Sequence, residues 1–118
     1  MSQLPVTIYH NPRCSKSRGA LEILRSRGIE PTIIEYLQNP PDAKTLDRLL
    51  QLAGVEPRDA MRKQEPEYKD LRLDDSKRTR AQLIAAMVKH PALIERPIVV
   101  RGSKAVIARP SERVEEIL

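Results

Sequence analysis

The pattern of apolar and polar residues first predicts a strand–helix–strand unit near the N-terminus. Residues 6–9 (Val-Thr-Ile-Tyr) form a short run rich in β-branched side chains, which is typical of a strand. Residues 15–27 predict a helix that ends at Gly28. The apolar stripe of this helix consists of Ala20, Leu21 and Leu24. Residues 32–36 predict a second strand, so the two strands are expected to pair in parallel with a right-handed crossover.

Helical periodicity dominates the middle of the chain. Residues 39–42 (Asn-Pro-Pro-Asp) predict a turn and a helix start, and Gly54 is expected to end that helix. Its apolar positions recur at helical spacing and are Leu46, Leu49, Leu50 and Ala53. Residues 57–75 are polar and charged, and only short helical pieces are expected there. Thr79 and Gln82 have the spacing of a capping box and open a further helix, which ends before Pro91.

The C-terminal part predicts two more strands and a last helix. Residues 98–100 and 105–107 are apolar, and the tight turn at 101–104 between them indicates a hairpin. Ser111 is expected to be the N-cap of the C-terminal helix. The order is β-α-β, an inserted helical block, then β-β-α. This order predicts an α/β, thioredoxin-like fold with a mixed sheet flanked by helices, and 118 residues fit a single domain over 1–118.

Composition narrows the classes of function. The formal net charge is +5, which suits a nucleic acid, a small anion or simple solubility. The arginines are scattered among acidic residues, so the sequence favours a small anionic substrate over nucleic acid. No membrane-spanning stretch or signal peptide is expected, and one cysteine excludes an internal disulfide. We therefore expect a cytoplasmic protein, acting as a monomer.

Cys14 is the main candidate for chemistry, because it lies just after a strand and at the start of a helix. A helix N-terminus lowers the pKa of a thiol, and the nearby positive charges of Arg13, Lys16 and Arg18 act in the same direction. His10 could contact the sulfur as an imidazolium. The alternatives are a buried structural cysteine and a histidine that merely completes the turn. No metal site is expected, because one cysteine and two distant histidines do not supply a ligand set.

Ser17 stands where a dithiol oxidoreductase would carry its second cysteine. Without a resolving thiol in this loop, an adduct on Cys14 must be cleared by an external thiol. Glutathione, with glutaredoxin behind it, is the expected donor. The sequence therefore predicts a single-cysteine mechanism and no bound cofactor.

Several segments together resemble the glutaredoxin-linked arsenate reductase (ArsC) family. The loop at 10–18 (His-Asn-Pro-Arg-Cys-Ser-Lys-Ser-Arg) is similar to the family's active-site loop. The further matching segments, in order, are 30–34 with Tyr36, 39–41, 61–63, 90–91, 96–100 and 109–112. The resemblance covers nearly the whole chain, and each segment is weak evidence on its own.

This resemblance implies roles for specific residues. Cys14 matches the nucleophile that forms a thiolate–arsenate adduct, and His10 matches a histidine that helps to keep the cysteine ionised. The residues implied in substrate binding are Arg62, Arg96, Arg109, Ser17 and Arg18. Guanidinium groups suit this task, because they match the oxygens of an oxyanion with paired hydrogen bonds. Thioredoxin-like folds also place a cis proline beside the reactive cysteine; Pro97 is the candidate, and the sequence leaves its isomer open.

Two departures from the family pattern keep alternatives open. Members tied to arsenic resistance tend to carry Gly-Thr where this chain has Ser15 and Lys16, and residues 63–68 also differ. The alternative substrates are another oxyanion or a glutathionylated protein. A third alternative is a transcription-regulator module of the same fold that binds RNA polymerase. The absence of a second cysteine at Ser17 and the complete set of three arginines argue against that module.

Overall fold

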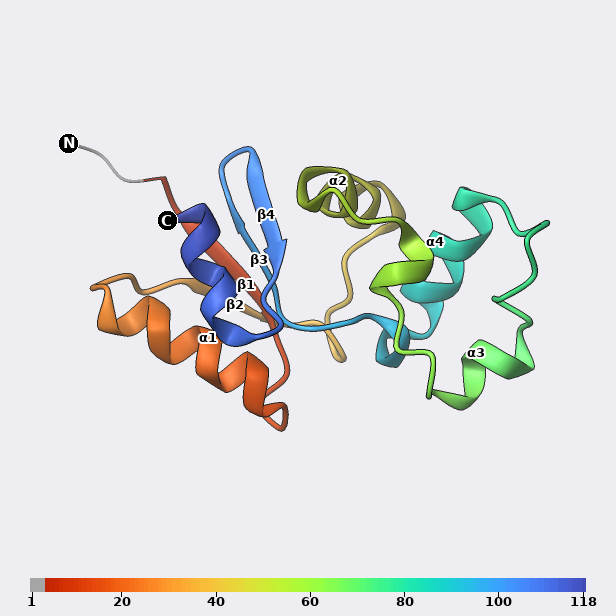
Figure 1. The fold of residues 1–118 in the computed structure, drawn as a ribbon, viewed down its shortest axis with the longest axis horizontal. Coiled ribbons are helices and arrows are strands. Elements are labelled where there is room, and N and C mark those ends of the chain that lie inside the picture. The colour runs from red at the N-terminus through yellow and green to blue at the C-terminus, as the bar shows by residue number, and fades with distance from the viewer. Residues whose placement is uncertain (1–3) are drawn as a thin grey trace.

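The computed structural model describes residues 4–118, which form a four-stranded sheet at one end of an elongated molecule and a helical lobe at the other (Figure 1). The strands are β1 (Val6–His10), β2 (Thr32–Glu35), β3 (Ile98–Arg101) and β4 (Lys104–Ile107). The α-helices are α1 (Ser15–Ser26), α2 (Ala43–Ala53), α3 (Pro66–Asp70) and α4 (Arg80–Lys89). Three short 3₁₀ helices complete the chain: η1 (Pro57–Ala60), η2 (Pro91–Leu93) and η3 (Ser111–Ile117).

The sheet has the order β2-β1-β3-β4 and is mixed. Strands β1 and β2 pair in parallel, whereas β1–β3 and β3–β4 pair antiparallel. The β-α-β, helical block, β-β order and the parallel first pair are therefore confirmed, and a helical element follows β4 as predicted. Because side chains alternate along each strand, the sheet offers two apolar faces to its neighbours.

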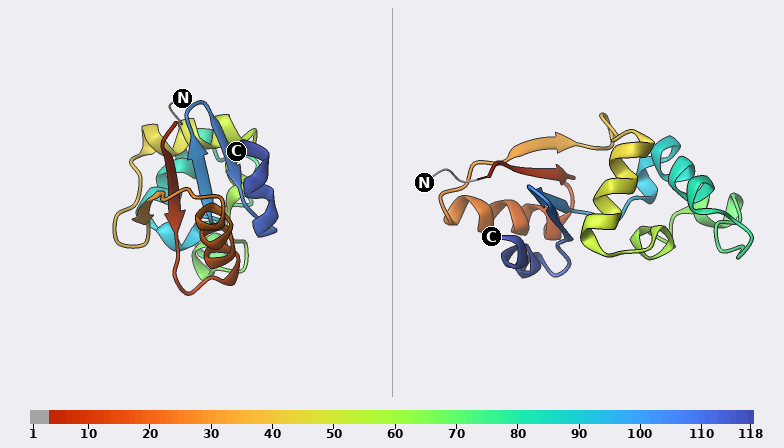
Figure 2. Two further views of the ribbon diagram at one scale, coloured as in Figure 1. Left: turned by 90° about the vertical axis from the view of Figure 1, so that its left-hand side faces the viewer. Right: turned by 90° about the horizontal axis from the view of Figure 1, so that it is seen from above.

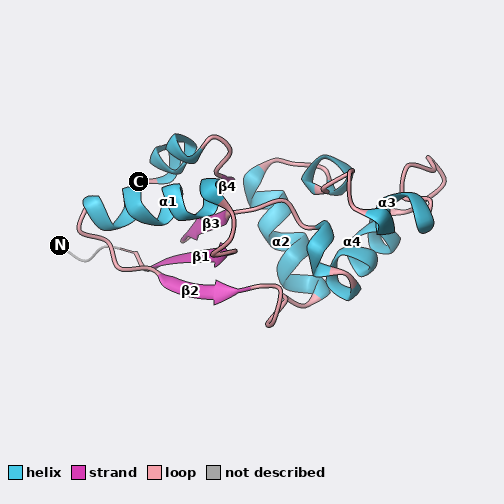
Figure 3. Ribbon diagram, turned by 90° about the horizontal axis from the view of Figure 1, so that it is seen from below, coloured by secondary structure: helices cyan, strands magenta, loops and turns pink. Residues whose placement is uncertain are grey.

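The two faces of the sheet are covered by different elements. Alternate strand residues such as Ile8 and Val99 pack with Ala20 and Leu24 of α1 and with Val114 of η3. Figure 2 shows α1 and η3 together on this face. The other face carries the second cluster, in which strand residues meet α2 and α4; its members include Tyr9, Ile98, Ile107, Leu46, Leu49, Leu50 and Met87. All strands lie in one half of the molecule and α2–α4 in the other (Figure 3).

Local chemistry explains where the helices begin and end. The carboxylate of Asp42 caps α2 by accepting a hydrogen bond from the Thr45 backbone N–H at 2.7 Å, and Gly54 ends that helix in the left-handed region. Thr79 and Gln82 form the predicted capping box at α4. The expectation of short helical pieces between 57 and 75 is also confirmed. None of the helices in the described range is long and apolar enough to cross a membrane.

The prediction that Ser111 caps a C-terminal α-helix was wrong. Residues 111–117 form a 3₁₀ helix, and the residue at its N-cap is Pro110. The Ser111 hydroxyl instead donates a hydrogen bond to the backbone oxygen of Lys16 at 2.8 Å. The hydroxyl therefore ties the last segment of the chain to the first turn of α1.

Two loop segments far apart in the sequence pair next to the sheet. Met61 and Ile94 form an isolated antiparallel bridge. The Arg62 N–H donates to the Leu93 oxygen at 2.7 Å, and the Glu95 N–H donates to the Ala60 oxygen at 2.8 Å. This pairing brings the chain at Arg62 beside the chain that enters β3.

Candidate active site at Cys14

Cys14 lies at the N-cap of α1, in the turn that follows β1. Its backbone N–H donates to the Asn11 oxygen at 3.0 Å, and its oxygen accepts the Arg18 N–H at 2.9 Å. The backbone N–H groups of Lys16 and Ser17, in the first turn of α1, act on the sulfur and lower the pKa of the thiol. The residue is buried, with 7% of its surface exposed. Because the free N–H groups of a helix N-terminus favour negative charge, this turn suits a thiolate.

Arg109 reaches the sulfur from the opposite end of the chain. Its Nη1 lies 3.7 Å from Sγ of Cys14 and donates to the backbone oxygen of Arg96 at 3.0 Å. Both arginines precede a cis proline, at Arg96–Pro97 and Arg109–Pro110. The isomer that the sequence left open at Pro97 is therefore cis.

Opposing effects act on the pKa of the Cys14 thiol. Burial raises this pKa, which is the largest single effect. The backbone N–H groups of Ser17 and Lys16, the positive charge of Arg96 and the hydrogen bond from Arg109 all lower it. Together these favourable contacts outweigh burial, so the net pKa is lowered below its ordinary value. A lowered pKa increases the thiolate fraction, and the thiolate is the nucleophilic form.

The predicted arginines have different surroundings. Arg96 is the most enclosed, with 12% of its side chain exposed, and its Nε and Nη1 atoms are buried without a hydrogen-bond partner among residues 4–118. Arg62 pairs with Glu65 at 2.9 Å, while its Nε is likewise buried and unpaired within that range. Buried guanidinium N–H groups without partners carry a free-energy cost, so this region is suited to receive an acceptor.

The structure gives His10 a partner in the loop, which corresponds to the alternative of a histidine that completes the turn. Its Nδ1 is hydrogen-bonded to the Ser17 hydroxyl at 2.5 Å. Burial lowers the pKa of His10, and the positive charges of Arg25 and Arg18 add to this effect against the opposing charge of Glu35. A histidine of ordinary pKa is already mostly neutral at pH 7, so this ring is neutral there. His10 supports the loop rather than supplying a positive charge.

The side chains of Ser17 and Arg18, which were predicted to bind substrate, make hydrogen bonds within the loop that carries Cys14. Ser17 is completely buried, and its hydroxyl accepts the Asn11 backbone N–H at 3.0 Å in addition to bonding His10. Arg18 is exposed and donates to the Pro12 oxygen at 3.0 Å. In the structure both side chains hold the shape of the loop 10–14, and the Ser17 contribution to the sulfur comes from its backbone.

This geometry agrees with the comparison to known proteins. The sequence profile of the ArsC family matches residues 9–117. The chain belongs to the ArsC family. An arsenate reductase from Rhizobium meliloti (strain 1021) is 44% identical over 115 residues, which covers 98% of this chain and 82% of that protein. The uncharacterized protein YfgD of Escherichia coli (strain K12) is 52% identical over 114 residues, covering 96% of each chain.

Solved structures of the ArsC family confirm the fold. An arsenate reductase from Vibrio cholerae superposes with a TM-score of 0.95 at 49% identity, covering 99% of this chain and 100% of that chain. The thioredoxin-like α/β fold predicted from the order of elements is therefore confirmed.

The ArsC-type site contains two residues that the sequence analysis did not select. Tyr36 is buried, and the positive charges of Arg96 and Arg62 lower the pKa of its hydroxyl against the effect of burial. Burial raises the pKa of Tyr36, so its hydroxyl keeps its proton. The second residue is Glu95, whose carboxylate lies near both Arg96 and Arg109. The sequence signal that could have identified Glu95 is its position directly before Arg96.

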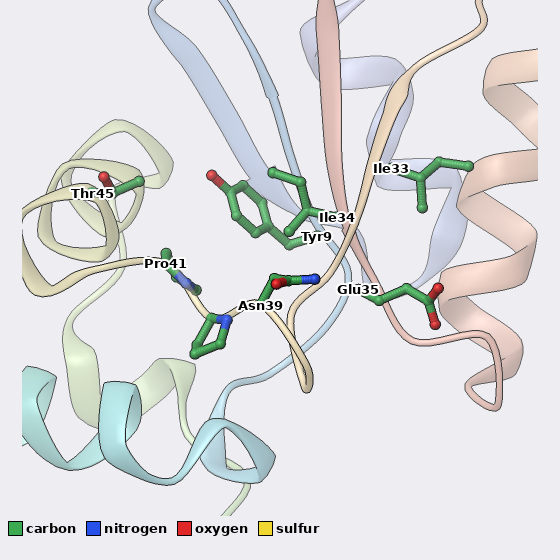
Figure 4. A pocket seen from close by; sticks show the side chains of 8 residues that line it. Tyr9, Ile33, Ile34, Glu35, Asn39, Pro41 and Thr45 are labelled. Carbon is green, nitrogen blue, oxygen red and sulfur yellow. The ribbon is translucent and has the colours of Figure 1, made fainter.

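One cavity beside the sheet is separate from this site. A cavity of about 500 Å³ lies between β2 and the start of α2, and Figure 4 shows Tyr9, Ile34 and Thr45 along its wall. Its lining contains neither Cys14 nor the three arginines. A second groove of about 350 Å³ runs beside the loop 10–13 and includes Glu35 and Leu37. Across residues 4–118, no three metal-ligating side chains gather into a group that could hold a metal ion.

Proposed function

We propose that this protein reduces arsenate to arsenite at Cys14, with glutathione as co-substrate and glutaredoxin as the final reductant. The observation that carries the proposal is the contact between Arg109 and the Cys14 sulfur, beside the unpaired buried donors of Arg96. A thiolate next to empty anion-binding groups is the arrangement that covalent capture of an oxyanion requires. Arsenate reductases at 44–48% identity over most of the chain support arsenic as the atom attacked.

The first step forms a covalent adduct. The Cys14 thiolate attacks arsenic, an S–As bond forms, and one As–O bond breaks with the oxygen leaving as water after protonation. The guanidinium groups of Arg96 and Arg109 neutralise the remaining oxygens of the bound anion. Tyr36 keeps its O–H, because burial raises its pKa, and it contributes a neutral donor to the same region. Arsenic stays in the +5 state during this step.

The second and third steps need thiols from outside the chain, because Cys14 is the sole cysteine. A glutathione thiolate attacks the Cys14 sulfur, the S–As bond breaks, and its electron pair leaves with arsenic, which becomes arsenite in the +3 state. Cys14 is then held in a mixed disulfide with glutathione. A glutaredoxin thiolate then attacks the glutathione sulfur of this mixed disulfide. The glutathione is transferred to glutaredoxin, and the Cys14 thiolate is released. Because the proposed reaction depends on glutathione, we propose that it takes place in the cytoplasm. One chain supplies all the residues of the proposed site, which agrees with action as a monomer.

The proposal is tested by arsenate-dependent NADPH consumption, coupled through glutathione reductase, glutathione and glutaredoxin. Turnover is expected to need arsenate, glutaredoxin and Cys14, and Cys14→Ser should abolish it because an un-ionised hydroxyl is a far weaker nucleophile. Circular dichroism of Cys14→Ser serves as the control for folding. Activity that persists in Cys14→Ser would contradict the proposed nucleophile.

A negative result with arsenate is also informative. If Cys14 has an acidic thiol but no arsenate is reduced, the site acts on another oxyanion or on a glutathionylated protein. Release of glutathione from a glutathionylated peptide, with and without Cys14→Ser, separates these two alternatives. Co-purification with RNA polymerase, together with absence of every reductase activity, would instead favour the regulator module.

A further inference from the structure

A carboxylate lies inside the cluster of arginines at the candidate site. Glu95 Oε1 is 3.6 Å from Nε of Arg109 and 3.8 Å from Nη1 of Arg96. Its side chain is 23% exposed, but Oε1 itself is buried and has no hydrogen-bond partner among the described residues. The Glu95 N–H donates to the Ala60 oxygen at 2.8 Å, so the backbone that carries the carboxylate is anchored.

Two donor atoms and the acceptor of this cluster have no hydrogen-bond partner. The atoms of this cluster that are buried without partners in the described structure are Nε and Nη1 of Arg96 and Oε1 of Glu95. Neither of the Glu95 distances is that of a charge-assisted hydrogen bond, which is typically about 2.7–2.9 Å. An occupant that satisfies the whole cluster must therefore accept hydrogen bonds from the arginines and donate one to Glu95.

We propose that Glu95 is a specificity-determining residue that selects a protonated tetrahedral oxyanion over a fully ionised one. Hydrogen arsenate and hydrogen phosphate carry both acceptor oxygens and an O–H, so they satisfy the arginines and the carboxylate together. Sulfate and fluorophosphate carry no O–H, and they would place an acceptor oxygen against the unpaired acceptor of Glu95. A site that leaves a buried polar group unpaired rejects the wrong ligand strongly. The inference rests on the proposed function only in taking this cluster as the oxyanion site.

The same carboxylate has a second effect on the resting site. Its negative charge offsets part of the positive charge of Arg96 and Arg109, which lowers the affinity for anions in general. Removal of the Glu95 charge should therefore strengthen binding of every anion. The discrimination by Glu95 is measured as the ratio of the affinities for an anion with an O–H and an anion without one.

Alkylation of the protein's one cysteine provides the measurement. Iodoacetamide is neutral, and its reaction with Cys14 should slow when an anion occupies the site. Half-protection concentrations are measured in mildly alkaline buffer at constant ionic strength for hydrogen phosphate, sulfate and fluorophosphate. All three are dianions there, and hydrogen phosphate alone carries an O–H. We expect hydrogen phosphate to protect at a concentration at least about tenfold lower than either of the other two, on the scale of one charged hydrogen bond.

Variants assign the preference to the carboxylate. In Glu95→Gln the amide N–H₂ can donate to sulfate, so the preference for hydrogen phosphate over sulfate should fall to within about threefold. Glu22→Gln removes the same charge from an exposed position on α1 and should leave the ratio unchanged. Fluorophosphate tests the inference in the unmodified protein, so the result does not depend on the folding of Glu95→Gln.

The outcomes separate this inference from the proposed function. Equal protection by all three anions in the unmodified protein, or an unchanged ratio in Glu95→Gln, would overturn the role of Glu95 while leaving an anion site at Cys14. Absence of protection by every anion would overturn the oxyanion site and this inference together. If hydrogen phosphate protects at the expected lower concentration but arsenate is not reduced, the role of Glu95 is supported. Only the proposal of arsenate reduction is then contradicted.

Discussion

The guanidinium of Arg109 contacts both the sulfur of Cys14 and the backbone of Arg96. Its Nη1 donates to the backbone oxygen of Arg96 at 3.0 Å and lies 3.7 Å from Sγ of Cys14, although 95 residues separate Arg109 from the cysteine. The contact with Arg96 fixes the direction of the guanidinium, and the contact with sulfur stabilises the thiolate. In the proposed reaction, capture of the oxyanion and activation of the thiol therefore depend on the same side chain.

Arg109→Ala should raise the pKa of Cys14. In the unmodified protein the hydrogen bond from Arg109 lowers this pKa, so its removal protonates more of the thiol at any given pH. The curve of iodoacetamide reactivity against pH should shift to higher pH. Arg113→Ala is the control, because it removes an exposed arginine that is paired with Glu116, and its curve should not shift. Identical curves for Arg109→Ala and the unmodified protein would show that Arg109 does not act on the thiolate.

Arg96→Ala should weaken binding of the oxyanion. The buried N–H groups of Arg96 that lack partners would be lost, and a hydrogen bond to a charged group contributes about 1.5–3 kcal/mol. The concentration of arsenate that half-protects Cys14 from alkylation should rise correspondingly, with the exposed Arg48→Ala as control. Unchanged protection in Arg96→Ala would assign Arg96 a structural role.

Local pattern accounts for what the sequence could predict. Strands, helices and caps follow from periodicity and from a few capping residues, such as Asp42 and Thr79, which act within one turn of the chain. Cys14 could be selected because its own neighbours define a helix N-terminus. The family resemblance then added Arg62, Arg96 and Arg109, which no local pattern would single out.

Contacts between distant segments account for what the sequence missed. The bridge between Met61 and Ile94 places Glu95 against the site, and no local periodicity encodes that bridge. A contact of His10 with the sulfur was one hypothesis because His10 lies at the end of the strand before Cys14, but the partner of its Nδ1 is the buried hydroxyl of Ser17. Ser111 has the residue type and position of an N-cap, yet its hydroxyl donates a hydrogen bond to the backbone oxygen of Lys16 in α1.

Ser17→Ala should destabilise the fold. Its buried hydroxyl is the partner of both His10 Nδ1 and the Asn11 N–H, and an unpaired buried polar group costs about 1–3 kcal/mol. Urea unfolding should show a reduced free energy of unfolding by about this amount. Ser15→Ala changes the same residue type at an exposed position in the same turn. A loss of equal size in Ser15→Ala would mean that the effect does not come from the two hydrogen bonds.

Stability should decrease when the pH falls below the ordinary pKa of histidine. Burial lowers the pKa of His10 in the folded state from 6.5, so the unfolded chain binds this proton more readily. The stabilisation is complete above 6.5 and is lost as the pH falls from there through the lowered pKa of the folded state. The free energy of unfolding, measured against pH in urea, should fall less steeply in His10→Asn. Parallel curves for the two proteins would show that His10 does not contribute to this loss.

Gly19→Ala should disturb the site without altering any residue that contacts substrate. A Cβ at position 19 would lie 2.5 Å from the Ser111 hydroxyl oxygen, and rotation of that hydroxyl would break its hydrogen bond to Lys16. That bond anchors the segment that begins at Arg109, so the guanidinium should move from the sulfur. The pKa of Cys14 should rise, although alanine itself favours the helix by about 1 kcal/mol.

A second substitution tests this explanation of the Gly19→Ala effect. Ser111→Ala alone removes the anchoring hydrogen bond but creates no overlap, so it should raise the pKa of Cys14 to a smaller extent. The double variant Gly19→Ala/Ser111→Ala replaces the 2.5 Å contact by one of 3.1 Å to the remaining Cβ, which a small shift can relieve. Its alkylation curve should therefore lie near that of Ser111→Ala. If the double variant is instead as impaired as Gly19→Ala, the overlap with the Ser111 hydroxyl is not the cause, and the effect originates within α1.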